Sequence, residues 1–134
     1  MVAFTEQQRA FLDQPLSAVV ATLRRDGTAS QSVVWFVREG DELWMSVAPD
    51  SLKARHLRRD PRISVLVLSA NGWQFLEVEG TATTDERVTP ELRLRLIGKY
   101  VGADRAPAWV ADHPLPGPNT LVRIRPGRVV EHLG

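Results

Sequence analysis

Short β-rich runs joined by turn residues occupy most of this sequence, and such runs restrict the fold to an antiparallel sheet. Asp26-Gly27, a strong hairpin signal, divides the segment 16–37 into two of these runs. A second turn, at residues 38–41, leads into a third run. Residues 16–48 are therefore predicted to form three strands of an antiparallel meander.

The second half of the chain repeats this pattern. Residues 62–69 and 73–84 are β-rich and are separated by the turn residues 70–72. In the later run apolar and charged residues alternate, as is typical of a strand with one buried face. A last hairpin is predicted over residues 120–133, with its turn at Pro126-Gly127. Six or seven short strands with hairpin turns predict a mainly β fold, a closed antiparallel barrel, as a single domain over the 134 residues.

Capping residues and prolines predict a few short helices. Each of them follows a Thr or Ser that can cap its first turn, and the third also has a proline at its first position. The predicted helices are the segment from Thr5 to Pro15, with Gln8 completing a capping box, residues 52–59 after Ser51, and residues 90–101 after Thr89. Asp60-Pro61 ends the second helix, and the prolines from Pro107 to Pro118 predict a loop.

Composition excludes several classes of function. The chain has no cysteine, which removes disulfides, thiolate catalysis and Cys-based metal sites. Seventeen Lys and Arg against sixteen Asp and Glu give a net charge of +1, which is too small for a dedicated nucleic-acid binder. No apolar run reaches membrane-spanning length and no secretion leader is recognisable, so we expect a cytoplasmic protein with no membrane partner.

Conventional catalytic motifs are missing from the sequence. The three histidines, His56, His113 and His132, lie far apart and in no metal-binding spacing, so no metal is expected. No nucleophile elbow, dinucleotide fingerprint or P-loop occurs. We therefore assign no catalytic residue.

A local basic cluster is the one distinctive charge feature. It comprises Lys53, Arg55, His56, Arg58, Arg59 and Arg62, offset by Asp60 alone. Such a run is most often a solvated helix face. However, Ser51 and Lys53 lie at the start of the predicted helix, where main-chain N–H groups and the helix dipole favour an anion. This arrangement suits the phosphate of a small molecule.

Two segments carry a resemblance to a known superfamily. They read SLKARHLRRDPRISVLV at 51–67 and GWQFLEVEGTAT at 72–83. They resemble the flavin- and deazaflavin-binding split β-barrels of the pyridoxamine 5'-phosphate oxidase-like superfamily, most closely the branch that uses coenzyme F420. The resemblance extends over residues 5–101 and returns in the last hairpin. It implies a homodimer with two cofactor sites at the subunit interface.

Cofactor-binding residues follow from this resemblance by position. The ring system would contact the second strand at Ser30, Ser32, Val33, Val34 and Trp35. The ribityl chain and phosphate would lie against Ser46, Val47, Ser51, Leu52 and Lys53. Trp73 and Gln74 would come from the other subunit, and Arg55 would face either the acidic tail of the cofactor or solvent.

The sequence departs from the FMN oxidases of the superfamily at two of these positions. Those enzymes usually carry an arginine and a lysine where this chain has Ser30 and Trp35. Losing two cationic contacts favours F420 over FMN. The expected activity is hydride transfer between F420 and an unsaturated organic small molecule, with the hydride carried by the cofactor. An FMN-binding oxidoreductase or flavin-binding protein is the alternative, and a nucleic-acid-binding or regulatory module is a third.

Overall fold

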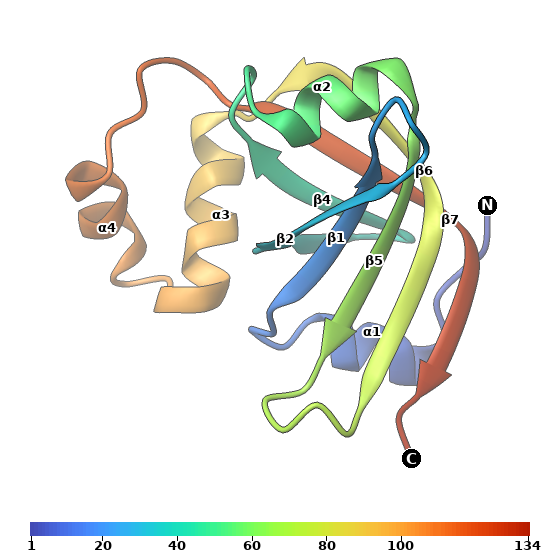
Figure 1. Ribbon diagram of the computed structural model, residues 1–134. Helices are drawn as coiled ribbons and strands as arrows, with labels where there is room; N and C mark the ends of the chain where they lie inside the picture. The colour runs from blue at the N-terminus through green and yellow to red at the C-terminus, as the bar shows by residue number, and fades with distance from the viewer.

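Seven antiparallel strands form one sheet in the computed structural model, which describes residues 1–134 (Figure 1). The strands are β1 Ala18–Leu23, β2 Ala29–Val34, β3 Val37–Glu39, β4 Glu42–Val47, β5 Arg62–Leu68, β6 Phe75–Arg87 and β7 Thr120–His132. The helices are α1 Glu6–Leu12, α2 Leu52–Arg59, α3 Pro90–Val101 and α4 Ala106–Asp112. The predicted mainly β fold with six or seven strands and a few short helices is confirmed.

The sheet curves into a split barrel. The strands do not lie in the sheet in the order in which they occur along the chain. Its strand order is β2-β1-β5-β6-β7-β4-β3, so β2 and β3 are consecutive in sequence but lie at opposite edges. Strands β6 and β7 are the longest and are paired along most of their length. Their bending brings β4 around to face β1 (Figure 1).

The predicted three-stranded meander over residues 16–48 is wrong. This segment contains four strands in two separate hairpins, β1 with β2 and β3 with β4. Between them, Trp35 and Phe36 leave the sheet, and the Phe36 N–H donates to the Tyr100 hydroxyl at 3.2 Å. Because Tyr100 belongs to α3, this break depends on a tertiary contact that no local pattern encodes.

The predicted hairpin at Pro126-Gly127 is also wrong, because β7 continues through both residues. Pro126 pairs with Gly80 and Arg128 pairs with Glu79, which leaves Gly127 as an extra residue in a β-bulge. Proline and glycine are frequent at bulges as well as at turns, so the local signal was ambiguous.

Three helices are confirmed and a fourth was missed. The capping box of Thr5 and Gln8 is present, Ser51 Oγ accepts from the Ala54 N–H at 3.2 Å, and α3 spans the predicted residues. Helix α4 begins at Ala106, just before the predicted loop, and has Pro107 in its first turn, where proline is tolerated. Only the part of that loop after α4 lacks helix.

Two clusters of buried apolar side chains hold the sheet and the helices together. The larger contains 20 buried residues and fills the barrel beneath α1 and α2, with Leu76 and Val78 on the buried face predicted for β6. The smaller contains seven and joins α3 and α4 to the barrel, with Leu96 and Ile97 of α3 in the same cluster as Leu121 of β7. The second cluster places α3 beside the open end of the barrel, next to the site described below.

Candidate functional site

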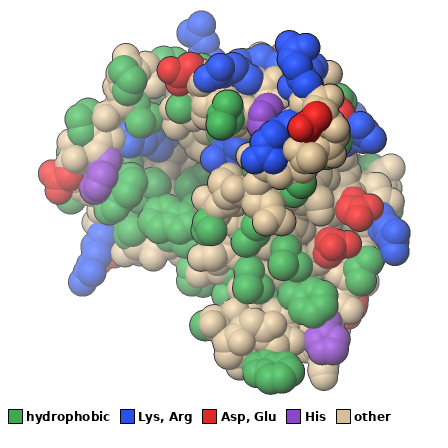
Figure 2. Space-filling model, viewed as in Figure 1, with side chains coloured by type: hydrophobic (Ala, Val, Ile, Leu, Met, Phe, Trp, Pro, Cys, Tyr) green, Lys and Arg blue, Asp and Glu red, His purple; other side chains and the backbone are tan.

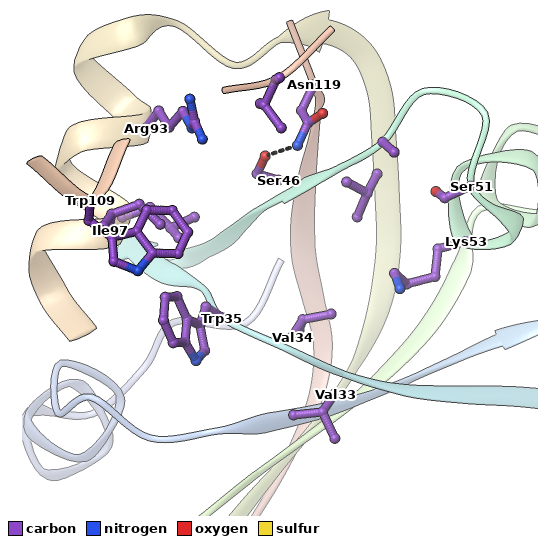
Figure 3. Close-up of a pocket in the computed structure, with 14 residues that line it drawn as sticks. Val33, Val34, Trp35, Ser46, Ser51, Lys53, Arg93, Ile97, Trp109 and Asn119 are labelled. Atoms are coloured by element: carbon purple, nitrogen blue, oxygen red, sulfur yellow. Dashed lines mark hydrogen bonds between the residues drawn. The ribbon is translucent and has the colours of Figure 1, made fainter. Parts of the chain in front are cut away.

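A cavity of about 520 Å³ lies between the barrel and α3, and we call it the α2–α3 cavity (Figure 3). Nine of its fourteen lining residues are hydrophobic. Its size and apolar lining fall within the range of small-molecule sites. Seven of the predicted cofactor-binding residues line it: Val33, Val34, Trp35, Ser46, Val47, Ser51 and Lys53. The structure thus brings together residues from β2, β4 and α2 that are separated in sequence.

Stacked aromatic rings form one wall of the cavity. The indole of Trp35 lies 4.5 Å from the Tyr100 ring at an interplanar angle of 3°, and 6.1 Å from the Trp109 ring. Trp35 follows the end of β2, whereas Trp109 comes from α4. Figure 3 shows both indoles on the same side of the cavity. This wall presents flat apolar surface to a bound ring system.

Lys99 stabilises the segment that carries Trp35. Its Nζ donates to the main-chain oxygens of Leu12 at 2.8 Å and Phe36 at 2.9 Å, and lies 3.7 Å from the centre of the Phe36 ring. Burial disfavours the charged amine and lowers the pKa of Lys99 to about 8. Lys99 and Tyr100 of α3 therefore hold the chain where it crosses from β2 to β3.

The first turn of α2 offers hydrogen-bond donors at the opposite side of the cavity. Ser51 satisfies the Ala54 N–H, whereas the N–H groups of Leu52 and Lys53 have no acceptor within the chain. The Lys53 side chain makes no hydrogen bond or ion pair, and Figure 3 shows it directed into the cavity. An anion placed here would meet two free N–H groups and an ammonium group.

Only two lining residues of the cavity are charged, Lys53 and Arg93, and both are cationic. The remaining polar lining includes Asn119, whose Nδ2 donates to Ser46 Oγ at 2.9 Å. No carboxylate lines the cavity. Its electrostatic character therefore favours an anionic ligand.

The arginines of the basic cluster have contacts within the chain. Arg55 donates to the Asp50 carbonyl, Arg58 to the Pro49 carbonyl and Arg59 to the Leu23 carbonyl. Arg62 pairs with Asp60 at 2.8 Å. Figure 2 shows the resulting concentration of Lys and Arg over the α2 end of the molecule. Most of this cluster thus helps to hold α2 and its flanking loops on the barrel.

His56 is the buried member of that cluster. Its Nδ1 lies 2.9 Å from Thr22 Oγ1 of β1. Burial, followed by the nearby arginines, lowers the pKa of His56. The histidine therefore acts in the contact between α2 and β1, away from the cavity.

Six predicted site residues do not line the cavity. Ser30 and Ser32 are half-buried on β2, and Leu52 and Arg55 are exposed on α2. Trp73 and Gln74 lie in the β5–β6 turn, at the end of the sheet away from α2 (Figure 1). Gln74 Nε2 donates to the Leu133 carbonyl at 3.1 Å. Within one chain these two residues are remote from the α2–α3 cavity, and their assignment to the site of a neighbouring subunit stays a prediction.

Sequence reasoning missed half of the lining. The additional residues are Ala48, Arg93, Leu96, Ile97, Trp109, Leu115 and Asn119. All but Ala48 belong to the segment from α3 to the start of β7. Helical periodicity could have indicated that Leu96 and Ile97 are buried, but no local pattern shows that α3 and α4 pack beside β4.

Comparison with known families shows to which protein family this chain belongs. The family model described as pyridoxamine 5'-phosphate oxidase matches residues 4–133. The chain belongs to this family. The resemblance to the pyridoxamine 5'-phosphate oxidase-like superfamily, inferred from residues 51–67 and 72–83, is thereby confirmed.

Solved structures with the same fold carry different descriptions. One described as an F420 reductase has a TM-score of 0.72 and 24% identity, over 95% of this chain and 98% of that one. A conserved protein of Mycobacterium tuberculosis has a TM-score of 0.74 and 24% identity, over 98% and 86% of the two chains. General Stress Protein 26 of Bacillus anthracis str. Sterne has a TM-score of 0.68 and 20% identity, over 95% and 92%. These similarities establish the split-barrel fold.

No helix combines the length and apolar character needed to cross a bilayer. His, Asp and Glu side chains form no group of three or more that could hold a metal ion.

Proposed function

We propose that this protein is an oxidoreductase that binds coenzyme F420 in the α2–α3 cavity and transfers hydride between it and an unsaturated organic small molecule. The observation that carries this proposal is an unpaired Lys53 beside two free N–H groups, at one side of an otherwise apolar cavity. A deazaflavin combines the same features, a flat apolar ring system and a phosphate. The solved structure described as an F420 reductase supports this choice.

The residues of the cavity divide into two groups by their chemistry. Lys53 and the first turn of α2 would hold the phosphate, since a helix N-terminus and an ammonium group both favour negative charge. Val33, Val34 and Trp35 would contact the ring system and exclude water from it. When bound, the deazaflavin supplies or accepts the hydride. The protein's own part is to bind, orient and desolvate the reactants.

FMN is the second candidate cofactor, and the pyridoxamine 5'-phosphate oxidase family match supports it. However, Ser30 on β2 and Trp35 just after it provide no cation, and charge-assisted hydrogen bonds contribute about 1.5 to 3 kcal/mol each. We expect F420 to bind about tenfold more tightly than FMN at matched salt. Fluorescence titration with each cofactor measures this ratio, and tighter binding of FMN would reverse the assignment.

A Lys53→Ala variant tests the phosphate assignment. We expect about 10- to 100-fold weaker F420 binding, because the lost ammonium contact would be poorly screened inside the cavity. Arg59→Ala is the matched control on the same helix, because its guanidinium donates to the Leu23 carbonyl outside the cavity. Equal losses at both positions would show that general positive charge, not the cavity, binds the cofactor.

The basic end of α2 also allows a direct test of the third function, nucleic-acid binding. In that case Lys53, Arg58 and Arg59 would contribute comparably to the affinity for duplex DNA, and affinity would fall steeply with salt. The main-chain contacts of Arg58 and Arg59 favour a structural role instead. Salt-dependent binding of duplex DNA at micromolar concentration would support the nucleic-acid function.

We also propose that two copies associate and that each completes the other's cofactor site. Trp73 is 76% exposed and Val33 67% exposed, which leaves large apolar side chains on the surface of a single chain. A second copy would cover such residues and bring Trp73 and Gln74 to the partner's cavity.

A further inference from the structure

Arg93 is a cation without an acidic partner at the edge of the α2–α3 cavity. It lies on the first half of α3, is half-buried, and donates to the main-chain carbonyl of His113. No carboxylate lies within ion-pair distance of it, whereas Arg95 on the same helix pairs with Glu39 at 2.5 Å. A guanidinium has five N–H donors in a planar fork, so most of its hydrogen-bonding capacity remains available.

A second crevice meets the cavity at this arginine. The crevice has a volume of about 470 Å³ and lies between α3, α4 and the segment before β7. Arg93, Leu115 and Asn119 line both spaces, so these residues mark the junction between them. Val88, Leu94 and Val110 contribute apolar surface on the crevice side, and no carboxylate lines either space.

The two cationic side chains of the α2–α3 cavity, Lys53 and Arg93, lie on different helices and have different surroundings. Figure 3 shows Lys53 on the α2 side and Arg93 on the α3 side, with Ser46 in the region between them. Lys53 lies in a helix N-terminal turn with two free N–H groups, which suits a phosphate. Arg93 has no such array of N–H groups and offers instead a fork that matches a carboxylate in a bidentate manner.

From this geometry we infer that Arg93 binds the carboxylate of the substrate, and that the substrate's apolar body lies at the junction of the cavity and the crevice. The substrate class is then an unsaturated, mainly apolar carboxylic acid. As a statement about the substrate this rests on the proposed function, since the acid would share the cavity with the cofactor. The carboxylate site itself can be measured without cofactor.

The test compares a planar unsaturated acid with its uncharged ester. Binding of trans-cinnamate and methyl trans-cinnamate to the cofactor-free protein is measured by ligand-observed NMR titration. We expect the wild-type protein to prefer the acid, and Arg93→Gln to weaken acid binding by about 10- to 100-fold with little effect on the ester. Arg93→Lys keeps the charge but loses the planar fork, so it should restore only part of the affinity for the acid.

Arg95→Gln is the matched control, because it removes a paired arginine from the same helix outside both spaces. It should leave acid binding unchanged. Equal binding of acid and ester by the wild-type protein, or an unchanged acid affinity in Arg93→Gln, would overturn the inference. Equal losses in Arg93→Gln and Arg95→Gln would also overturn it, because they would indicate a general charge effect.

Titration of the same variants with F420 separates this inference from the proposed function. If Arg93→Gln weakens F420 binding as strongly as Lys53→Ala and leaves cinnamate binding unchanged, Arg93 belongs to the cofactor site and the inference fails. If the wild-type protein does not bind F420 but binds cinnamate through Arg93, the proposed function fails and the carboxylate site stands.

Discussion

Trp35 of the cavity wall lies flat against Tyr100 of α3, with ring centroids 4.5 Å apart and planes 3° apart. The Tyr100 hydroxyl in turn donates to the Leu16 carbonyl at 2.8 Å and accepts from the Phe36 N–H at 3.2 Å. One side chain of α3 thus supports the cavity wall and the crossing between the two hairpins. Positioning of the site and stability of the fold are therefore linked at this contact.

Tyr100→Phe tests that link. The ring stays stacked on Trp35, but the Phe36 N–H loses its hydroxyl acceptor. We expect the free energy of unfolding to fall by about 1 to 3 kcal/mol, because a half-buried donor is left without a partner. Urea unfolding followed by tryptophan fluorescence measures the change. A loss below about 0.5 kcal/mol would show that the hydroxyl is not needed to hold the crossing.

The lowered pKa of Lys99 predicts that the folded protein becomes more stable as the pH rises above 8. Its pKa is about 8 in the folded protein and near the ordinary lysine value when unfolded, so above pH 8 the unfolded state binds more protons. The free energy of unfolding should therefore increase between pH 8 and 9.5, by about 1 kcal/mol after allowance for solvent screening. Above pH 10 the raised pKa of Tyr100 acts in the opposite direction. Lys99→Met should abolish the increase in urea titrations across this range.

His56 predicts a loss of stability in mild acid. Its pKa is lowered in the folded protein, mainly by burial, so the unfolded state binds the proton more readily as the pH falls through about 6.5. Stability should then decline between pH 7 and 5. His56→Gln should flatten this decline in chemical unfolding experiments, whereas His132→Gln at an exposed position should not. An unchanged pH profile in His56→Gln would contradict the assignment.

Gly80 is required by the bulge that bends β6 and β7. A Cβ at this position would lie 2.1 Å from the Arg125 carbonyl oxygen, so one strand must move. We expect Gly80→Ala to destabilise the protein by about 1 to 3 kcal/mol. Gly117→Ala is the control, because no atom lies within 4 Å of the Cβ there. Comparable urea midpoints for the two variants would mean that the bulge adapts without cost.

The proposed assembly predicts a mass of about twice the 15.0 kDa of one chain. Light scattering of the purified protein measures it, with and without F420. Trp73→Ser should shift the mass toward the monomer and weaken F420 binding, because this exposed indole is assigned to the partner's site. A stable monomer at micromolar concentration with F420 present would remove the shared-site arrangement.

Three of the four helices could be predicted from local sequence, and α4 could not. Ser51 and Thr89 accept from N–H groups in the first turns of α2 and α3, and the proline after Asp60 ends α2 as expected. The alternation in β6 likewise predicted its buried face at Leu76 and Val78. These features depend on interactions between residues only a few positions apart, which a sequence pattern records directly.

Tertiary structure alone decided how the strands are ordered and what encloses the cavity. Pro126-Gly127 is compatible with both a turn and a bulge, and pairing with Glu79 and Gly80 selected the bulge. Likewise, Arg93 and Trp109 reach the cavity only because α3 and α4 pack on the barrel through the second apolar cluster. Burial of apolar surface does not depend on direction or on sequence separation, so local patterns can indicate that a helix face is buried but not which surface covers it.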